Sequence, residues 1–187
     1  CWGKGDSGQL GYNNPDSKGG SDGDMASIGT VFLGGRTAIA IAAGSAHTCA
    51  ILEDGTVKCW GENEFGQLGQ NSTVDIGDGA GEMQGLNPVN LGDGRTAKAI
   101  SAGDHHTCVI LDTNEVKCWG CGNEGRLGYD STANMGDGEA GNTLMADLQP
   151  VNLHGRYAIG IVASSDFTCV VLDAVDGNYS NVKCWGD

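Results

Sequence analysis

Residues 47–69 read HTCAILEDGTVKCWGENEFGQLG. Two short runs of mainly apolar residues flank Asp54 and Gly55, and an Asp-Gly pair between such runs is a strong signal of a β-hairpin. Cys49 and Cys59 stand at the two ends of this hairpin. The stretch therefore predicts two antiparallel strands joined by a tight turn, with one cysteine on each strand.

The same stretch recurs along the chain. A Cys-Trp-Gly triplet occurs four times, at spacings of 58, 59 and 66 residues, and begins at Cys1, Cys59, Cys118 and Cys184. A Gly-Gln/Arg-Leu-Gly corner, a Gly-Arg segment and a Thr-Cys pair also recur, each at the equivalent position of every repeat, which we call the same phase. Self-similarity at a fixed period indicates a repeat architecture. We divide the chain into repeats 1–58, 59–117 and 118–187, of which residues 184–187 start the phase of a further repeat.

Each repeat indicates β structure with long loops. Residues 38–43 and 97–102 alternate large and small side chains, as expected of a strand with two faces. Glycine makes up 33 of the 187 residues, which disfavours long helices. Between the Gly-Gln-Leu-Gly corner and the Gly-Arg segment lies a polar insertion rich in Gly, Asp, Asn and Ser. The fold class expected is all-β, with tandem repeats of about 60 residues in propeller blades or a β-solenoid.

Residues 47–69, together with the Leu-Gly-Asp-Gly-Arg-Thr-Ala segment at 91–97, resemble repeats of the regulator of chromosome condensation family. The resemblance covers all three units. It implies four-stranded propeller-type blades with long Gly/Asp-rich loops, in a ring that family members usually close with seven blades. In its cysteines and its long loops, the chain resembles extracellular members of this family more than the nuclear exchange factor.

Eight cysteines are many for a cytosolic chain. Six pair by repeat phase, each pair at the ends of one hairpin, where the two Cα atoms are expected about 5.5 Å apart. The expected disulfides are Cys49–Cys59, Cys108–Cys118 and Cys169–Cys184. Cys1 and Cys121 are left over. They pair with each other, within or between chains, or Cys1 pairs with a cysteine upstream of this segment.

Two glycosylation sequons begin at Asn71 and Asn178, both in expected loops. Together with the paired cysteines they predict a secreted, extracellular glycoprotein. Oxygen ligands on flexible loops suit calcium, so the acidic loops are weak calcium candidates, with solvated loop charge as the alternative. The candidate ligands are Asp75, Asp78, Asp130 and Asp137.

The charge and the repeats exclude several functions. The formal net charge of −14 disfavours nucleic acids and anionic membranes, and no apolar run is long enough to span a bilayer. Residues 5–8 match the nucleophile segment of chymotrypsin-like proteases, but Ser7 shares its phase with Phe65 and Glu124. His47 and His106 share a phase with Phe167, so they are expected in the core. We predict no catalysis.

We expect a non-catalytic structural or adhesive protein that assembles head-to-tail into a filament or larger array. Its partners would be copies of itself or further repeats of the same chain. The alternative is a fragment of a complete β-propeller that acts as a protein-binding module, as family relatives do with a GTPase or an inhibited enzyme. The tryptophans that follow the strand-ending cysteines are expected to be packing anchors, namely Trp2, Trp60, Trp119 and Trp185.

Overall fold

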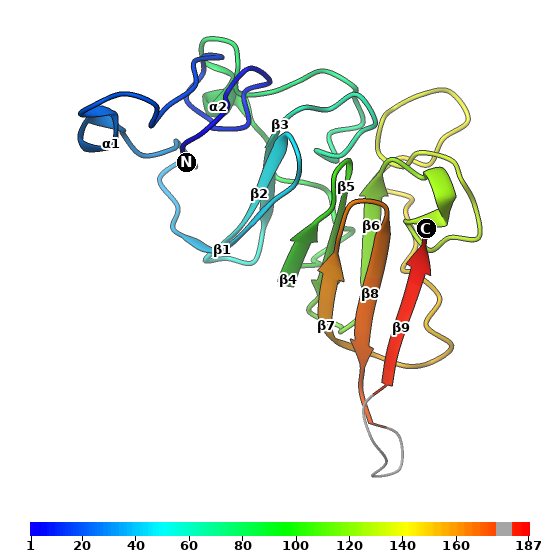
Figure 1. The fold of residues 1–187 in the computed structure, drawn as a ribbon. Helices are drawn as coiled ribbons and strands as arrows, with labels where there is room; N and C mark the ends of the chain where they lie inside the picture. Colours follow the sequence, from blue (N-terminus) through cyan, green and yellow to red (C-terminus); the bar gives the residue numbers. More distant parts are fainter. Residues whose placement is uncertain (175–180) are drawn as a thin grey trace.

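A computed structural model describes residues 1–174 and 181–187. It contains three antiparallel sheets of three strands each, in which sequential strands are neighbours (Figure 1). The first sheet comprises β1 (Ala38–Ala43), β2 (His47–Leu52) and β3 (Val57–Gly61). The second comprises β4 (Ala97–Ala102), β5 (His106–Leu111) and β6 (Val116–Gly120), and the third β7 (Ala158–Ala163), β8 (Phe167–Leu172) and β9 (Asn181–Gly186).

In residues 1–174 and 181–187, helical structure is limited to single turns in the connections. These are α1 (Asp24–Ser27), α2 (Glu82–Gly85) and the 3-10 turn η1 (Asn123–Gly125). Both α1 and α2 begin after a glycine with positive φ, Gly23 at 86° and Gly81 at 84°. The fold class is therefore all-β, as the sequence predicts.

In the first two sheets, single contacts stand in the place of a fourth strand. At the outer edge of β3, Gly61 forms an isolated antiparallel bridge with Ile76, and Val89 donates its N–H to the Val57 carbonyl. The second sheet repeats this with Gly120 and Met135. The segment between the bridge and Val89 cannot continue as a strand, because Gly77 and Gly81 adopt positive φ there. The first and second sheets thus each have three full strands plus this rudimentary edge.

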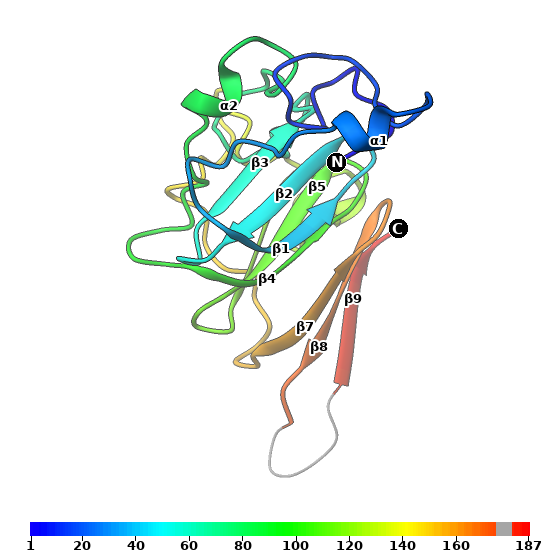
Figure 2. The same cartoon turned by 90° about the vertical axis from the view of Figure 1, so that its left-hand side faces the viewer.

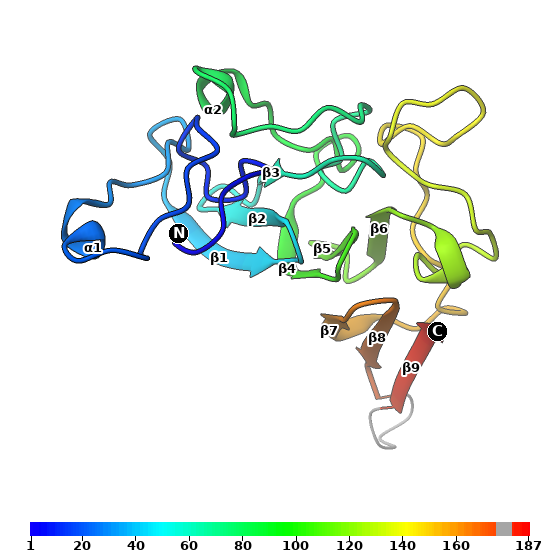
Figure 3. The ribbon, with the colours of Figure 1, turned by 45° about the horizontal axis from the view of Figure 1, so that its top comes forward.

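The sheets follow one another along an arc (Figures 1 and 2). The inner strands β1, β4 and β7 are adjacent to one another, and the outer loops lie at the far edge of each sheet, as Figure 3 shows. The core fills the spaces between the sheets. All side chains of β2, β3, β5 and β6 are buried, whereas β9 is mostly exposed. The third sheet thus presents one uncovered face, which includes Phe167, Val171 and Val182.

The burial of the four tryptophans depends on whether a neighbouring unit packs against them. Trp60 and Trp119 are buried, with exposed fractions of 1% and 0%, and Trp185 is half-buried. The prediction is wrong for Trp2, whose exposed fraction is 67%. Repeat phase predicts a buried side chain only where the unit that covers it is present.

Candidate functional site at the junctions between sheets

Each hairpin carries a disulfide. The structure joins Cys49 to Cys59, Cys108 to Cys118 and Cys169 to Cys184, the three pairs that the hairpin phase predicts. Their Cα atoms are 4.0, 4.1 and 4.1 Å apart. This spacing is shorter than the expected one, because it is that of a non-hydrogen-bonded strand pair rather than a hydrogen-bonded one.

The two remaining cysteines are free thiols in the described part of the chain. Cys121 is buried, with an exposed fraction of 2%, and Cys1 is half-buried. The structure therefore does not contain the predicted intrachain bond between them.

One backbone carbonyl at each junction accepts two hydrogen bonds from the following sheet. The Gln67 carbonyl accepts from Thr107 Oγ1 and from Trp119 Nε1, both at 3.0 Å. The Gln9 carbonyl accepts in the same way from Thr48 and Trp60, and the Arg126 carbonyl from Thr168 and Trp185. The Gly-Gln-Leu-Gly corner thus aims one carbonyl at the next sheet, and we call this arrangement the junction latch.

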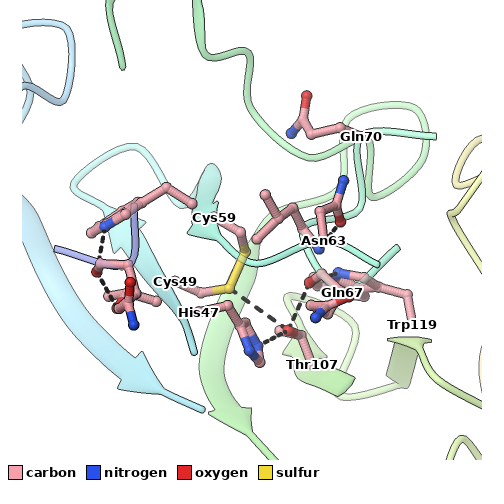
Figure 4. The surroundings of a disulfide bond; sticks show 12 residues. His47, Cys49, Cys59, Asn63, Gln67, Gln70, Thr107 and Trp119 are labelled. Carbon is pink, nitrogen blue, oxygen red and sulfur yellow. Dashed lines mark hydrogen bonds between the residues drawn. A yellow bond between two sulfur atoms is a disulfide. The ribbon is translucent and has the colours of Figure 1, made fainter. Parts of the chain in front are cut away.

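A buried histidine extends the latch. His47 Nε2 lies 2.9 Å from Thr107 Oγ1 (Figure 4), and His106 Nε2 lies 3.0 Å from Thr168 Oγ1. Because the threonine hydroxyl donates its proton to the Gln67 carbonyl, it must accept from the histidine. The Nε2 atom therefore carries a proton.

The second ring nitrogen has no partner. His47 Nδ1 and His106 Nδ1 are buried and make no hydrogen bond in the described residues. Burial lowers the pKa of each histidine from 6.5 to about 4. A Cβ at Gly44 would overlap the ring of His47, and a Cβ at Gly103 would overlap the ring of His106. Only glycine leaves room for the imidazole at these two positions.

An ion pair and further polar contacts add to the junctions on the side of the β1–β2 turn and its counterparts. His105 Nδ1 lies 3.0 Å from Glu62, which directly follows the last strand of the preceding sheet, and Arg126 pairs with Asp166 at 2.6 Å. Ser165 Oγ donates to Asp104 across the next junction. The sheets are held together by polar contacts as well as by the apolar core.

Two of the candidate calcium ligands, Asp75 and Asp137, accept hydrogen bonds from the protein. Among residues 1–174 and 181–187, no three His, Cys, Asp or Glu side chains are grouped to hold a metal ion. Asp75 accepts from the Asn63 N–H, and buried Asp137 accepts from the Glu139 N–H and from Asn142. Asp78 and Asp130 lie in the same outer loops, Asp130 with a φ of 54°.

The sequon residue Asn71 is exposed, and its Oδ1 accepts a hydrogen bond from the Met145 N–H at 2.8 Å. Asn178 lies outside the described residues. Its use as a glycosylation site, like that of Asn71, stays a prediction.

Sequence reasoning did not find the latch. Its acceptor is a backbone carbonyl, which leaves no trace in residue type. The signal that was available is the threonine before each disulfide cysteine, which recurs as Thr48, Thr107 and Thr168. The histidines were predicted as core residues, and the structure buries both.

Sequence comparison places these features in a known repeat family. Sequence models of the regulator of chromosome condensation (RCC1) repeat match residues 38–67, 97–126 and 54–110. The chain carries RCC1-type β-propeller repeats. The strands and latch residues of the first two sheets fall largely within these matched segments.

Several curated proteins are similar to much of this chain. The ultraviolet-B receptor UVR8 of Arabidopsis thaliana is 29% identical over 70% of the chain, which covers 27% of UVR8. The human E3 ubiquitin-protein ligase HERC2 is 33% identical over 71% of the chain and 2% of its own length. Human HERC3, a probable E3 ubiquitin-protein ligase, is 30% identical over 98% of the chain and 17% of its length. The chain thus spans less than a third of these relatives.

Solved structures show the same fold. Yeast RCC1 (Prp20), bound to Kap60, is 22% identical with a TM-score of 0.64, over 99% of this chain and 38% of its own. Human WBSCR16 is 14% identical with a TM-score of 0.65, over 92% of this chain and 39% of its own. No helix among the described residues is long and apolar enough to cross a membrane.

The disulfides lead to a first testable prediction. Replacing both Cys108 and Cys118 by alanine should lower the free energy of unfolding by about 3 kcal/mol, because the unfolded chain loses a closed loop of 10 residues. Urea denaturation of the variant and the parent measures this difference. Non-reducing peptide mapping is the companion experiment, and free thiols at the six paired positions would contradict the assignment.

Proposed function

We propose that the chain acts as a non-catalytic protein-binding module built from RCC1-type propeller blades. The repeats support this proposal, because yeast RCC1 (Prp20) was solved bound to Kap60, and its binding properties to Gsp1p and histones were studied. The junction latch supports it as well. A row of sheets fixed to one another by buried hydrogen bonds presents its loops in constant relative positions, as a binding surface requires.

The observation that carries the proposal is the charge of the outer loops. Ten of the 24 acidic residues lie in loops 12–30, 70–90 and 129–151, together with a single basic residue, Lys18. Among the residues described, the only ion pair inside these loops joins Lys18 to Asp16.

The opposite end of the sheets differs. There each unit pairs an arginine with the aspartate that lies near the β2–β3 turn or its counterpart, as in Arg95–Asp112 at 3.1 Å. The same pairing joins Arg36 to Asp54 and Arg156 to Asp173. Uncompensated negative charge therefore gathers at the outer loops, and the partner we propose is a protein with a basic surface.

The test uses two variants with equal net charge. One neutralises exposed outer-loop residues, Glu139→Gln with Asp147→Asn. Its control neutralises exposed residues at the opposite end, Glu53→Gln with Asp93→Asn. Core histones serve as the basic probe, and titration calorimetry gives the affinity at two salt concentrations. We expect the outer-loop variant to bind about fivefold more weakly, and the control to bind nearly as the parent does. Equal losses in both variants, or no binding by the parent, would contradict the proposal.

We further propose that the chain resides in an oxidising, extracellular compartment. The support is the three hairpin disulfides, since such bonds persist in secreted proteins and are rare in the cytosol. Thiol counting on protein purified from its native source is the test, and six reduced hairpin cysteines would contradict it.

Head-to-tail assembly is a second candidate function. One specific observation favours it: the first outer loop exposes a large apolar side chain, Met25, whereas the equivalent methionines of the next two loops are buried.

A further inference from the structure

The outer loop of the second repeat contains the triplet Asn71-Ser72-Thr73, which has the form of an acceptor for an N-linked glycan. Such a glycan is bulky and hydrated, so the folded protein accommodates it only where the asparagine side chain reaches solvent. The side chain must also be free of contacts that the sugar would break. Both conditions are decided by the structure of the loop.

The loop holds the backbone of Asn71 in place and leaves the rest of the residue open. Asn71 adopts the left-handed conformation, with a φ of 52°. A Cβ added at Gly138 would overlap the Asn71 carbonyl, so the loop of the following repeat packs directly against this backbone. The residue as a whole is nevertheless exposed. Its exposure therefore comes chiefly from the side chain.

The two polar atoms of the Asn71 side chain have different roles. Oδ1 accepts a hydrogen bond of 2.8 Å from the N–H of Met145, whose exposed fraction is 0%. Nδ2 donates no hydrogen bond to any residue that the structure describes. An N-linked sugar is carried on Nδ2, and the substituted amide keeps its oxygen as an acceptor. A glycan and the bond to Met145 are therefore compatible on one side chain.

The equivalent asparagine of the first repeat lacks this free atom. Asn13 Oδ1 accepts from the Met83 N–H in the same way, but Asn13 Nδ2 donates to Gln84 Oε1 at 3.0 Å. In the second repeat the corresponding acceptor is missing, because the residue after Met145 is Ala146. The amide nitrogen is thus committed in the first repeat and unused in the second.

The sequences of the three equivalent loops follow the same division. Residues 13–15 read Asn-Asn-Pro, which is not an acceptor triplet, and residues 130–132 read Asp-Ser-Thr, which lacks the amide. Residues 71–73 combine the asparagine with a threonine two positions later, and Thr73 is exposed as well. Of these three positions, only the second has both the acceptor triplet and the free amide nitrogen.

The order of synthesis also keeps the triplet accessible. The Met145 N–H, which fixes the Asn71 side chain in the folded protein, lies 74 residues further along the chain. Sugar transfer in the secretory pathway acts on chains that are still being translocated. Asn71 therefore meets the transferase before the third repeat has folded against it.

We propose that Asn71 carries an N-linked oligosaccharide, donated by a lipid-linked oligosaccharyl pyrophosphate. In the transfer step, Nδ2 forms a bond to the anomeric carbon of the first sugar. The bond between that carbon and the pyrophosphate oxygen breaks, the lipid pyrophosphate leaves, and the amide gives up one proton. The glycan stands on the outer loops, at the far edge of the sheets (Figure 3). This proposal rests on the extracellular compartment proposed above and does not depend on the basic partner.

The test changes single residues of the triplet in the full chain, which an added signal peptide directs into the secretory pathway of cultured human cells. Mass-spectrometric peptide mapping with and without peptide N-glycosidase F gives the occupancy of residue 71, in cell-associated and secreted protein alike. We expect a glycan in the parent and in the matched control Thr73→Ser, and occupancy at least about tenfold lower in Thr73→Ala. An unmodified Asn71 in the parent, or equal occupancy in Thr73→Ala, would overturn the proposal.

Thermal unfolding tests whether the sugar and the hydrogen bond coexist. The glycosylated parent should unfold at the same temperature as Thr73→Ala or at a higher one, because both retain the Oδ1 acceptor for Met145. Asn71→Asp also keeps this acceptor without a sugar and should behave as Thr73→Ala does. A lower midpoint for the glycosylated parent would show that the sugar disrupts the loop, against the proposal.

Mapping of the protein from its native source separates this proposal from that of the compartment. The same digest reports the occupancy of residue 71 and the state of the six hairpin cysteines. Oxidised cysteines with a glycan at Asn71 would support both proposals. Oxidised cysteines with an unmodified Asn71 would overturn the glycan and leave the compartment standing, and reduced cysteines with an unmodified Asn71 would overturn both.

Discussion

Lowering the pH from 7 to 5 should reduce the free energy of unfolding by about 4 kcal/mol through His47 and His106 alone, about 2 kcal/mol for each. Burial lowers their pKa from 6.5 to about 4 in the folded state. Between these values the unfolded chain binds more protons than the folded one. The stabilising contribution is therefore complete above pH 6.5 and is lost as the pH falls toward 4.

The physical origin is the orphan Nδ1 atom. Protonation there would place a charge at a buried atom that makes no hydrogen bond among the described residues, while Nε2 is already bonded to the threonine of the next sheet. Asp104 and, at His106, Asp166 favour the charged form, but they do not offset burial.

A double variant isolates this effect. His47→Gln with His106→Gln keeps a donor near the position of Nε2 and cannot titrate in this range. Chemical denaturation of parent and variant at pH 7, 6 and 5 should show a steeper loss for the parent. Replacement of the exposed His154 by glutamine is the control and should leave the parent's slope intact. Parallel slopes for the parent and the double variant would show that the buried histidines do not control acid stability.

Trp119→Ala should lower the free energy of unfolding by about 3 to 5 kcal/mol. The side chain is fully buried, with an exposed fraction of 0%, and its Nε1 donates to the Gln67 carbonyl across the junction. The substitution removes both the packing and one of the two hydrogen bonds of a latch.

The chain supplies its own matched control for this variant. Trp2 has the same repeat phase but an exposed fraction of 67%, so Trp2→Ala should change stability by less than about 1 kcal/mol. Urea denaturation measures both variants. Equal losses would mean that the tryptophan contributes within its own hairpin rather than through the junction.

Local features of this fold could be predicted from the sequence. The hairpin at residues 49–59 is defined by an Asp-Gly turn and by strands that are adjacent along the chain. The pairing of Cys49 with Cys59 follows from that hairpin and its repetition. The buried histidines could be predicted because Phe167 occupies the same phase.

Features that depend on contacts between repeats could not be predicted from the sequence. The acceptor of the junction latch is a backbone carbonyl. Because every residue has a carbonyl, the residue type does not reveal which one accepts. The resemblance implies four-stranded blades, but the segment after the Gly61–Ile76 bridge does not continue as a strand, because Gly77 and Gly81 adopt positive φ there. Trp2 carries the same motif as Trp60, and only the presence of a covering neighbour separates their environments.

The placement of each disulfide within a single hairpin bears on how the chain folds as it is synthesised. Cys49 and Cys59 are only 10 residues apart, as are Cys108 and Cys118. Each bond can therefore close soon after its own hairpin leaves the ribosome or translocon, before later repeats exist. Cysteines from different repeats then have little time to mispair. Addition or loss of a whole repeat by gene duplication or deletion would also leave every remaining pair intact.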